Sequence, residues 1–464
     1  MSRPSPIVGW IARMAIRLFY RVDRVGDVPA SGAVMLLPNH PNALLDPALI
    51  WTTSGRDVRF LAKSPLFEGL LRPLVVGSGA IPVYRRHDEG ADVSRNHEAF
   101  AAVDAALTEG DAICLFPEGI SHSTGRLVPL RTGAARMALS AEGGGARVAL
   151  VAVGLNFERK TAFRSRVTIV YGQPFTCADL AANLAEDGAA EHMTAVRGLT
   201  DRIASHMRRL LVEADPGADA ALVERVDRLY AAARGRVTAA SGHVSGAADS
   251  SARSRDAEDR VARRRAIAVG VQRLRVADPA RYDNILMQVR RYDDRLGRFG
   301  LRDRHLDWQV PASGAARFAV RESSIALVLL PLAIAAMIVF YIPYRLTGLA
   351  ARWFTGEPDV AATAKVVGGA IVYAAWFVAL AAAAWGLAGG RAALLLLTLL
   401  PAMAVAGLFA IERESAVMDA VRAWFVLRRT APGTRERLRR RRSELADLLD
   451  EVNEWLAMEK AGAL

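Results

Sequence analysis

The stretch that decides the fold reads Asn39-His40-Pro41-Asn42-Ala43-Leu44-Leu45-Asp46-Pro47. His40 and Asp46 are six residues apart. On a regular helix, two such residues lie about 240° apart around the axis and cannot share a helical face. We therefore expect His40 on a loop, which agrees with the extended backbone that a following proline favours. Asp46-Pro47 is typical of a cap followed by the first residue of a helix, so we expect a helix to begin at Pro47.

The combination of His40 and Asp46 predicts a site that removes a proton from an alcohol. An alcohol is a poor nucleophile at neutral pH, and histidine is the usual base because its ordinary pKa lies close to neutrality. A carboxylate on the far ring nitrogen would orient the imidazole and stabilise the imidazolium. Asp46 is the candidate for this role. Two alternatives are that Asp46 only caps the helix and that His40 is structural.

A second loop motif reads Phe116-Pro117-Glu118-Gly119-Ile120-Ser121-His122. Gly119 would allow a ligand to approach the backbone closely, while Glu118 could hydrogen-bond a hydroxyl group or brace an arginine. Ser121 could add a contact to an anion, and we expect His122 at the surface. The alternative is an ordinary turn after a strand, with Glu118 in solvent.

A basic segment lies between these motifs and reads Gly77-Ser78-Gly79-Ala80-Ile81-Pro82-Val83-Tyr84-Arg85-Arg86. A guanidinium group can bind two oxygens of a phosphate at once, so Arg85 and Arg86 are candidates for holding a phosphomonoester. Lys63 is a further basic residue, for which a solvated lysine is one interpretation. The apolar helix pattern that follows Lys63 would suit an acyl-chain wall or ordinary core equally well.

These segments, together with the apolar run Val148-Ala149-Leu150-Val151-Ala152-Val153-Gly154, resemble four blocks of the glycerolipid acyltransferase family in their usual order. The resemblance covers residues 30–175. The family's common pattern has one residue fewer between the histidine and the aspartate, and Leu45 occupies that position here. A branch similar to the fungal glycerol-3-phosphate and dihydroxyacetone-phosphate acyltransferases has the longer spacing. The fourth block lacks the proline usually found there.

The resemblance implies a membrane-bound enzyme that transfers a fatty acyl group from acyl-CoA or acyl carrier protein to glycerol 3-phosphate or 1-acylglycerol 3-phosphate. It implies no metal and no bound cofactor. The alternatives are transfer to another lyso-lipid or a lipid-linked amino acid, or a lipid transporter or scaffold without catalysis. The implied catalytic residues are His40 and Asp46, and the implied substrate-binding residues are Asn39, Lys63, Arg85, Arg86, Glu118, Gly119 and Ser121.

The hydrophobic pattern predicts an α/β fold. The resemblance implies that this fold is an acyltransferase domain with a mixed sheet flanked by helices. We expect His40 and Glu118 each to follow a strand, which would bring them into one crevice at the carboxyl edge of the sheet. The expected strands cover residues 33–37, 58–62, 79–83, 112–116, 148–155 and 166–172. The expected helices cover residues 47–53, 65–75, 93–108 and 131–141.

Composition narrows the choice of partners. Among 464 residues, 60 are Lys or Arg and 48 are Asp or Glu, giving a formal charge of +12. Such an excess suits nucleic acid or an anionic membrane. No nucleic-acid motif is evident, and the apolar segments favour the membrane. The two cysteines, Cys114 and Cys177, fit no metal-ligand spacing, so we expect reduced thiols.

Outside the acyltransferase domain, we expect membrane-associated and helical regions. Ser323 to Ile342, Val366 to Ala388 and Ala392 to Ile411 are each long enough to cross a bilayer. Three crossings would separate two Arg-rich regions that both favour the cytoplasm, so one span is expected to be re-entrant or interfacial. The expected location is a membrane of the bacterial inner-membrane type with a cytoplasmic catalytic domain.

The expected organisation has six parts. The first is an amphipathic helix that lies in a membrane interface or packs on the catalytic domain. We expect a break in the helical accessory region at Asp278-Pro279. In order, the parts are the helix at 1–22, the acyltransferase domain at 23–236, a flexible linker at 237–256, the accessory region at 257–320, the transmembrane region at 321–412 and a basic amphipathic tail at 413–464.

Overall fold

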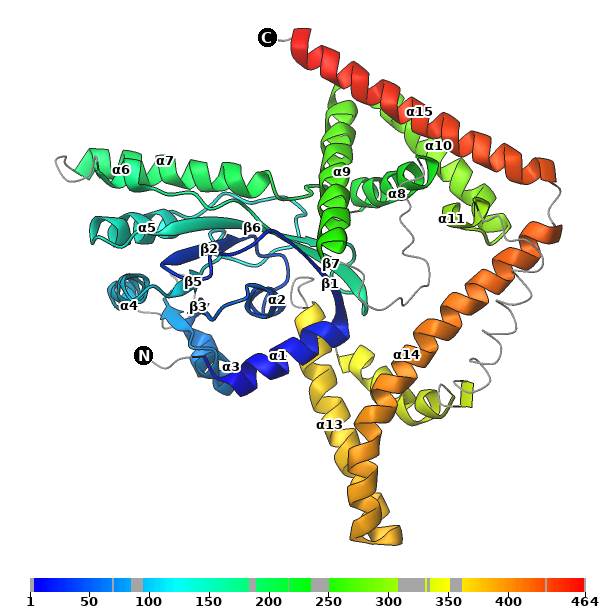
Figure 1. The fold of residues 1–464 in the computed structure, drawn as a ribbon, viewed down its shortest axis with the longest axis horizontal. Coiled ribbons are helices and arrows are strands. Elements are labelled where there is room, and N and C mark those ends of the chain that lie inside the picture. The colour runs from blue at the N-terminus through cyan, green and yellow to red at the C-terminus, as the bar shows by residue number, and fades with distance from the viewer. Residues whose placement is uncertain are drawn as a thin grey trace. The chain divides into compact units, whose positions relative to one another are not determined.

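The computed structural model describes residues 4–68, 71–84, 95–182, 189–215, 217–234, 250–307, 330–331, 334–350, 361–429 and 432–462. The chain forms two compact units. The first consists of Met1–Ala220, Ser245–Ala268 and Glu357–Thr363, and the second of Ala221–Val244, Val269–Gly356 and Ala364–Leu464. Figure 1 shows the elements of both.

A seven-stranded sheet in the order β1-β7-β6-β2-β5-β3-β4 forms the centre of the first unit. All neighbouring strands are parallel except β6 and β7, which run antiparallel, so the predicted mixed sheet is confirmed. The carboxyl ends of β6, β2, β5, β3 and β4 therefore meet at one edge. The strands are β1 (Tyr20–Val25), β2 (Val34–Pro38), β3 (Val58–Lys63), β4 (Ile81–Val83), β5 (Ala112–Cys114), β6 (Ala149–Phe157) and β7 (Ser165–Tyr171).

Helices cover both faces of this sheet. One face packs its alternate residues against α4 (Asn96–Thr108), α5 (Gly133–Gly143) and α7 (Ala189–Arg208), which contribute fully buried side chains to a single core. The other face carries α2 (Leu45–Thr53), whose Thr53 hydroxyl lies 2.8 Å from the Tyr171 hydroxyl. Short helical segments complete the unit: η1 (Ser64–Phe67), α3 (Arg72–Gly77) and α6 (Ala178–Ala182).

Both cysteines lie inside the first unit and are unbonded. Cys114 ends β5 and Cys177 precedes α6, and each is fully buried. Burial raises the pKa of Cys177 to about 12, and it also raises the pKa of Cys114, where the nearby Asp46 carboxylate adds to the effect. These thiols therefore stay protonated at neutral pH.

Strand β1 was not expected from the sequence. Its segment Tyr20–Val25 carries Arg21, Asp23 and Arg24, which hides the alternation of a half-buried strand. The strand lies at the edge of the sheet, beside β7, where charged side chains are tolerated and discourage further pairing. Asp23 is held by Arg260, 2.7 Å away, which belongs to α9 (Ser250–Ala277).

Helix α1 (Pro6–Phe19) has features of both alternatives considered for the amino-terminal segment. One face packs on the domain through the buried side chains Ile16 and Phe19, and the helix lies against α2. The opposite face exposes an apolar stripe at helical spacing. This stripe consists of Ile7, Trp10, Ile11, Met14 and Leu18.

The second unit contains a helical core. It is built from α8 (Ala218–Ala233), α10 (Pro279–Arg298), α11 (Asp303–Leu306) and α15 (Pro432–Gly462), with Tyr292, Leu306 and Leu445 fully buried. The expected break at Asp278-Pro279 is confirmed, since α9 ends at Ala277 and the Asp278 carboxylate accepts a hydrogen bond from the Arg281 amide at 2.9 Å. Residues 250–256, expected in the linker, are instead helical, and 235–249 lie outside the described residues.

Two helices of the described chain are long and apolar enough to cross a membrane. They are α13 (Ala361–Ala388) and the first 19 residues, Gly390–Leu408, of α14 (Gly390–Arg429). Gly389 joins them with φ of +82°, a conformation that suits glycine. Of the expected span 323–342, residues 323–329 and 332–333 lie outside the described residues, and 334–342 belong to a shorter apolar helix, Ile334–Ala350.

Candidate active site

His40 lies on the loop that leaves the carboxyl end of β2, as its spacing to Asp46 predicts. The ring Nδ1 is 2.9 Å from Oδ2 of Asp46. The imidazole stacks on the Phe116 ring with centroids 3.9 Å apart, and only 13% of its side chain is exposed. Among the described residues, the other ring nitrogen, Nε2, has no hydrogen-bond partner. The stacked ring therefore keeps one nitrogen for a substrate.

Asp46 lies in the first turn of α2, which begins at Leu45 and not at Pro47 as expected. Its side chain makes no capping hydrogen bond, and Oδ2 instead accepts from the Asn42 amide at 2.7 Å as well as facing His40. The carboxylate is fully buried, and Oδ1 has no partner among the described residues. Burial raises the Asp46 pKa, while the hydrogen bond and charge of His40 act in the opposite direction.

Glu118 joins the two loops of the site. It is buried, and Oε1 accepts a hydrogen bond from the His40 amide at 2.7 Å. Oε2 accepts from the Val128 amide at 3.1 Å and pairs with His122 Nε2. The His122 amide in turn donates to the His40 carbonyl at 3.1 Å. Glu118 thus holds backbone groups, and His122 is enclosed where a surface position was expected.

The remaining predicted residues lie in several different settings. The Asn39 amide pairs with the backbone of Leu155 in β6, at 2.7 Å to its N–H and 3.3 Å to its carbonyl. Lys63 is exposed at the carboxyl end of β3.

Gly119 has φ of +76°, and a Cβ there would lie 3.0 Å from Arg131. Ser121 is half-buried in the same loop, whereas Arg85 and Arg86 lie outside the described residues.

Lys160 is a residue of the site that sequence reasoning missed. Its ammonium group donates to the Pro41 carbonyl at 3.1 Å and to the Ser123 hydroxyl, so it joins both loops from the end of β6. Its positive charge also favours ionisation of Asp46. The available signal was topological, because the strand that precedes Lys160 pairs with β2 in parallel and ends at the same edge.

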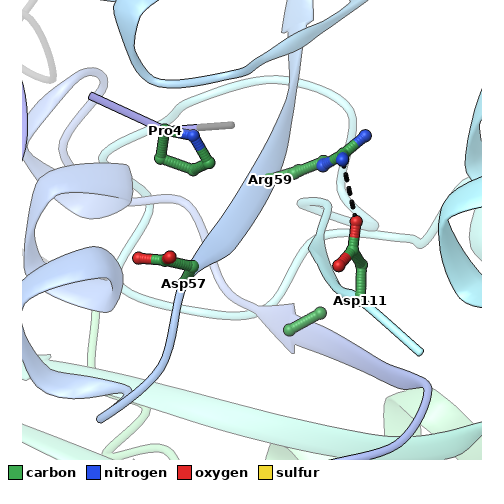
Figure 2. Close-up of a pocket in the computed structure, with 5 residues that line it drawn as sticks. Pro4, Asp57, Arg59 and Asp111 are labelled. Atoms are coloured by element: carbon green, nitrogen blue, oxygen red, sulfur yellow. Dashed lines mark ion pairs between the residues drawn. The ribbon is translucent and has the colours of Figure 1, made fainter. Parts of the chain in front are cut away.

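A small cavity of about 140 Å³ lies at the opposite, amino-terminal edge of the sheet. Figure 2 shows its lining, in which Arg59 and Asp111 form an ion pair of 2.9 Å beside Asp57 and Pro4. Asp57 precedes β3 and Asp111 precedes β5. The cavity is therefore separate from the histidine site.

Comparison with known proteins identifies the class. Residues 20–156 match the family model described as Acyltransferase. Glycerol-3-phosphate O-acyltransferase 2 of Saccharomyces cerevisiae is 38% identical over 17% of this chain and 11% of that protein. Glycerol-3-phosphate O-acyltransferase 1 of the same yeast is 30% identical over 27% of this chain and 16% of that protein. The chain thus spans less than a fifth of the length of these relatives.

Two further proteins resemble the chain. An uncharacterized acyltransferase of Schizosaccharomyces pombe is 29% identical over 27% of this chain and 18% of that protein. The crystal structure of the 1-acyl-sn-glycerophosphate acyltransferase PlsC from Thermotoga maritima is 17% identical, with a TM-score of 0.29 over 43% of this chain and 79% of that one. The expected family is confirmed: residues 20–156 carry an acyltransferase domain of the glycerolipid acyltransferase family.

Proposed function

We propose that this chain transfers a fatty acyl group from acyl-CoA or acyl carrier protein to the hydroxyl group of glycerol 3-phosphate or 1-acylglycerol 3-phosphate. The single observation that carries this proposal is the His40–Asp46 pair with an unpaired Nε2. The names of the two yeast relatives favour the glycerol phosphate acceptor.

His40 Nε2 takes the proton of the acceptor hydroxyl, and the oxygen attacks the thioester carbonyl carbon. A C–O bond forms, the C–S bond breaks, and the leaving thiolate takes the proton from the imidazolium. The carboxylate of Asp46 on Nδ1 holds the ring orientation and offsets its transient charge. Glu118, Asn39 and Lys160 hold the loop in place through backbone groups.

The acceptor phosphate is assigned to basic groups that end or follow two neighbouring strands in the sequence, of which Arg85 and Arg86 lie outside the described residues. Lys63 ends β3, and Arg85 and Arg86 follow β4, the neighbouring strand. Gly119 and Ser121 approach the acceptor from the second loop. These substrate contacts rest on strand order and on charge complementarity with a phosphomonoester.

A membrane location accounts for the apolar surfaces. The exposed stripe of α1, with Arg13 and Arg17 on the same helix, suits the interface between acyl chains and anionic headgroups. Helices α13 and Gly390–Leu408 suit a bilayer crossing. We assign the catalytic domain to the cytoplasmic side of a bacterial inner membrane, because Arg-rich regions next to membrane spans favour that side.

The test is an acceptor panel with the full chain in lipid nanodiscs. Labelled palmitoyl-CoA, or in a parallel assay labelled palmitoyl-acyl carrier protein, is supplied with glycerol 3-phosphate, 1-acylglycerol 3-phosphate, a lysophosphatidylcholine and a lipid-linked amino acid. Both thiol release and labelled lipid are measured. We expect turnover with the two phosphomonoester acceptors and none with the His40→Ala variant. Turnover only with the other acceptors would reject the assigned substrate, and no turnover with any acceptor or carrier would reject the enzyme.

A further inference from the structure

A second, strongly cationic cavity lies in the second unit. None of its residues takes part in the acyl-transfer mechanism proposed above. Its volume is about 310 Å³, at the lower end of the range typical of ligand sites. It lies between α10 and α15, which pack together. It is lined by Arg291, Tyr292 and Arg295 from α10 and by Arg437, Arg440, Arg441 and Glu444 from α15.

Helical spacing gathers these charges. Arg291 and Arg295 are one turn apart on α10, and Arg437, Arg441 and Glu444 follow one face of α15. Five guanidinium groups thus line the cavity together with one carboxylate, that of Glu444 on α15. Like charges at such spacing destabilise a helix pair, so the arrangement favours an anion that would lie between them.

The ion pairs of α15 separate its arginines into two groups. Arg442 forms an ion pair of 2.7 Å with Asp307, and Arg439 lies 3.6 Å from the same carboxylate. Of the cavity arginines, Arg441 and Arg440 share Glu444 at 2.9 Å and 3.8 Å. The other three have no acidic partner among the described residues, and Arg437 donates only to the Thr434 hydroxyl.

The floor of the cavity is held in place by a buried side chain, and several of its arginines are accessible to solvent. Tyr292 is 1% exposed, and its hydroxyl donates to Asp303 at 2.8 Å within the core of the unit. Arg441 also donates to the Gln288 side chain at 2.7 Å. Arg291 and Arg295 are exposed, so their guanidinium groups can rotate onto a ligand.

We propose that this cavity binds a phosphate-bearing ligand. Phosphate oxygens accept hydrogen bonds in pairs from planar guanidinium groups, which matches an all-arginine lining better than a lysine patch would. The phosphate is supplied either by a soluble molecule or by a lipid headgroup. The proposal does not depend on the identity of the acyl acceptor, because the cavity residues take no part in the histidine site.

The test measures two probes with the full chain in dodecyl maltoside micelles at fixed ionic strength. The first probe is radiolabelled inorganic pyrophosphate, and the second is radiolabelled phosphatidic acid in micelles that also contain excess phosphatidylcholine. The test variant is Arg291→Gln/Arg295→Gln. The matched control is Arg290→Gln/Arg298→Gln, which removes the same charge from exposed positions of the same helix outside the cavity.

We expect saturable binding that weakens about tenfold or more in the test variant, the loss that corresponds to about 1.4 kcal/mol, and stays unchanged in the control. Arg291→Lys/Arg295→Lys should give an intermediate affinity, because it keeps the charge and loses the paired donors. A response to pyrophosphate indicates a soluble ligand, and a response to phosphatidic acid alone indicates a headgroup.

Three results would overturn the proposal. The first is that neither probe shows saturable binding. The second is that the control variant weakens binding as much as the test variant, which would show a general effect of net charge. The third is unchanged binding in the test variant, which would place any bound phosphate elsewhere. Circular dichroism at 222 nm checks that each variant keeps its helices.

Discussion

Two buried aspartates, one in each unit, have opposite surroundings. Asp46 in the acyltransferase domain faces a histidine and one backbone amide, and its Oδ1 has no partner among the described residues. Asp303 in the helical unit pairs with Arg225, accepts from the Tyr292 hydroxyl at 2.8 Å and lies in the same core as Arg442.

The difference lies in how the negative charge is compensated. Arg225 carries a permanent positive charge, which Asp303 shares with Asp293. His40 carries a full charge only when protonated, so Asp46 gains its partner's charge at the step where a proton is taken up. A fully paired buried carboxylate stabilises a fold, whereas an incompletely paired one is suited to proton transfer.

The largest expected effect is on catalysis at the histidine. His40→Ala should lower kcat by about 10³-fold, within the range attributed to a positioned general base, while the melting temperature changes little. Steady-state thiol release and calorimetry measure the two quantities. His192→Ala, at an exposed position of α7, is the control and should keep full activity. A comparable loss of kcat in both variants would contradict the assignment of His40 as the general base.

Next comes the stability of the helical unit. Asp303→Asn removes one of the two carboxylates that pair with the buried Arg225, Asp293 being the other, which should cost about 3 kcal/mol of unfolding free energy. Acyl transfer at low temperature should persist. Thermal melting monitored by circular dichroism measures the change, with the exposed Asp294→Asn on α10 as control. If the melting curve does not move, Asp303 is not the structural counterpart of Asp46 described above.

Asp46→Asn should lower kcat about 30-fold, because a neutral amide replaces a charged hydrogen bond worth about 2 kcal/mol. Stability should not fall, since the variant buries no charge. Single-turnover rates and melting temperatures measure these effects, with exposed Asp57→Asn at the opposite edge as control. A variant that loses stability and keeps its rate would restore the capping alternative.

The same pair predicts a pH dependence. Burial raises the Asp46 pKa above the ordinary value of 3.8, so the folded chain holds this proton over a pH range in which the unfolded chain has released it. The unfolding free energy contributed by Asp46 therefore falls as pH rises from 3.8 through the raised pKa. The melting temperature of wild type relative to Asp46→Asn should decline over this interval. A difference that grows with pH would contradict the raised pKa.

The smallest effect is expected at Lys160, which holds the two loops through hydrogen bonds to Pro41 and Ser123. Lys160→Met should lower kcat about fivefold, in keeping with the loss of about 1 kcal/mol of hydrogen bonding. The neighbouring Arg159→Met, whose side chain is exposed, is the control. A loss as large as that of His40→Ala would give Lys160 a direct part in the reaction.

The parts of the fold that could be predicted are those that show a pattern within a short stretch of the sequence. The apolar strands and the placement of His40 and Glu118 after strands could be predicted, because each depends on residues close together in sequence. Strand β1 could not, since its charged side chains are tolerated only because it forms an edge. The contacts of Glu118 and Lys160 join segments brought together by strand order, which no single motif encodes.

The burial of Cys114 and Cys177 has a practical consequence for measuring on which side of a bilayer the ends of the apolar helices lie. Because the chain has no other cysteine, the native surface offers no thiol to a maleimide reagent. A single cysteine in place of the exposed Arg391, in the first turn of α14, or near the carboxyl terminus would then be the sole labelled position. Membrane-impermeant maleimides applied to intact and opened vesicles would report on which side of the bilayer each position lies. Neither natural cysteine would have to be replaced first.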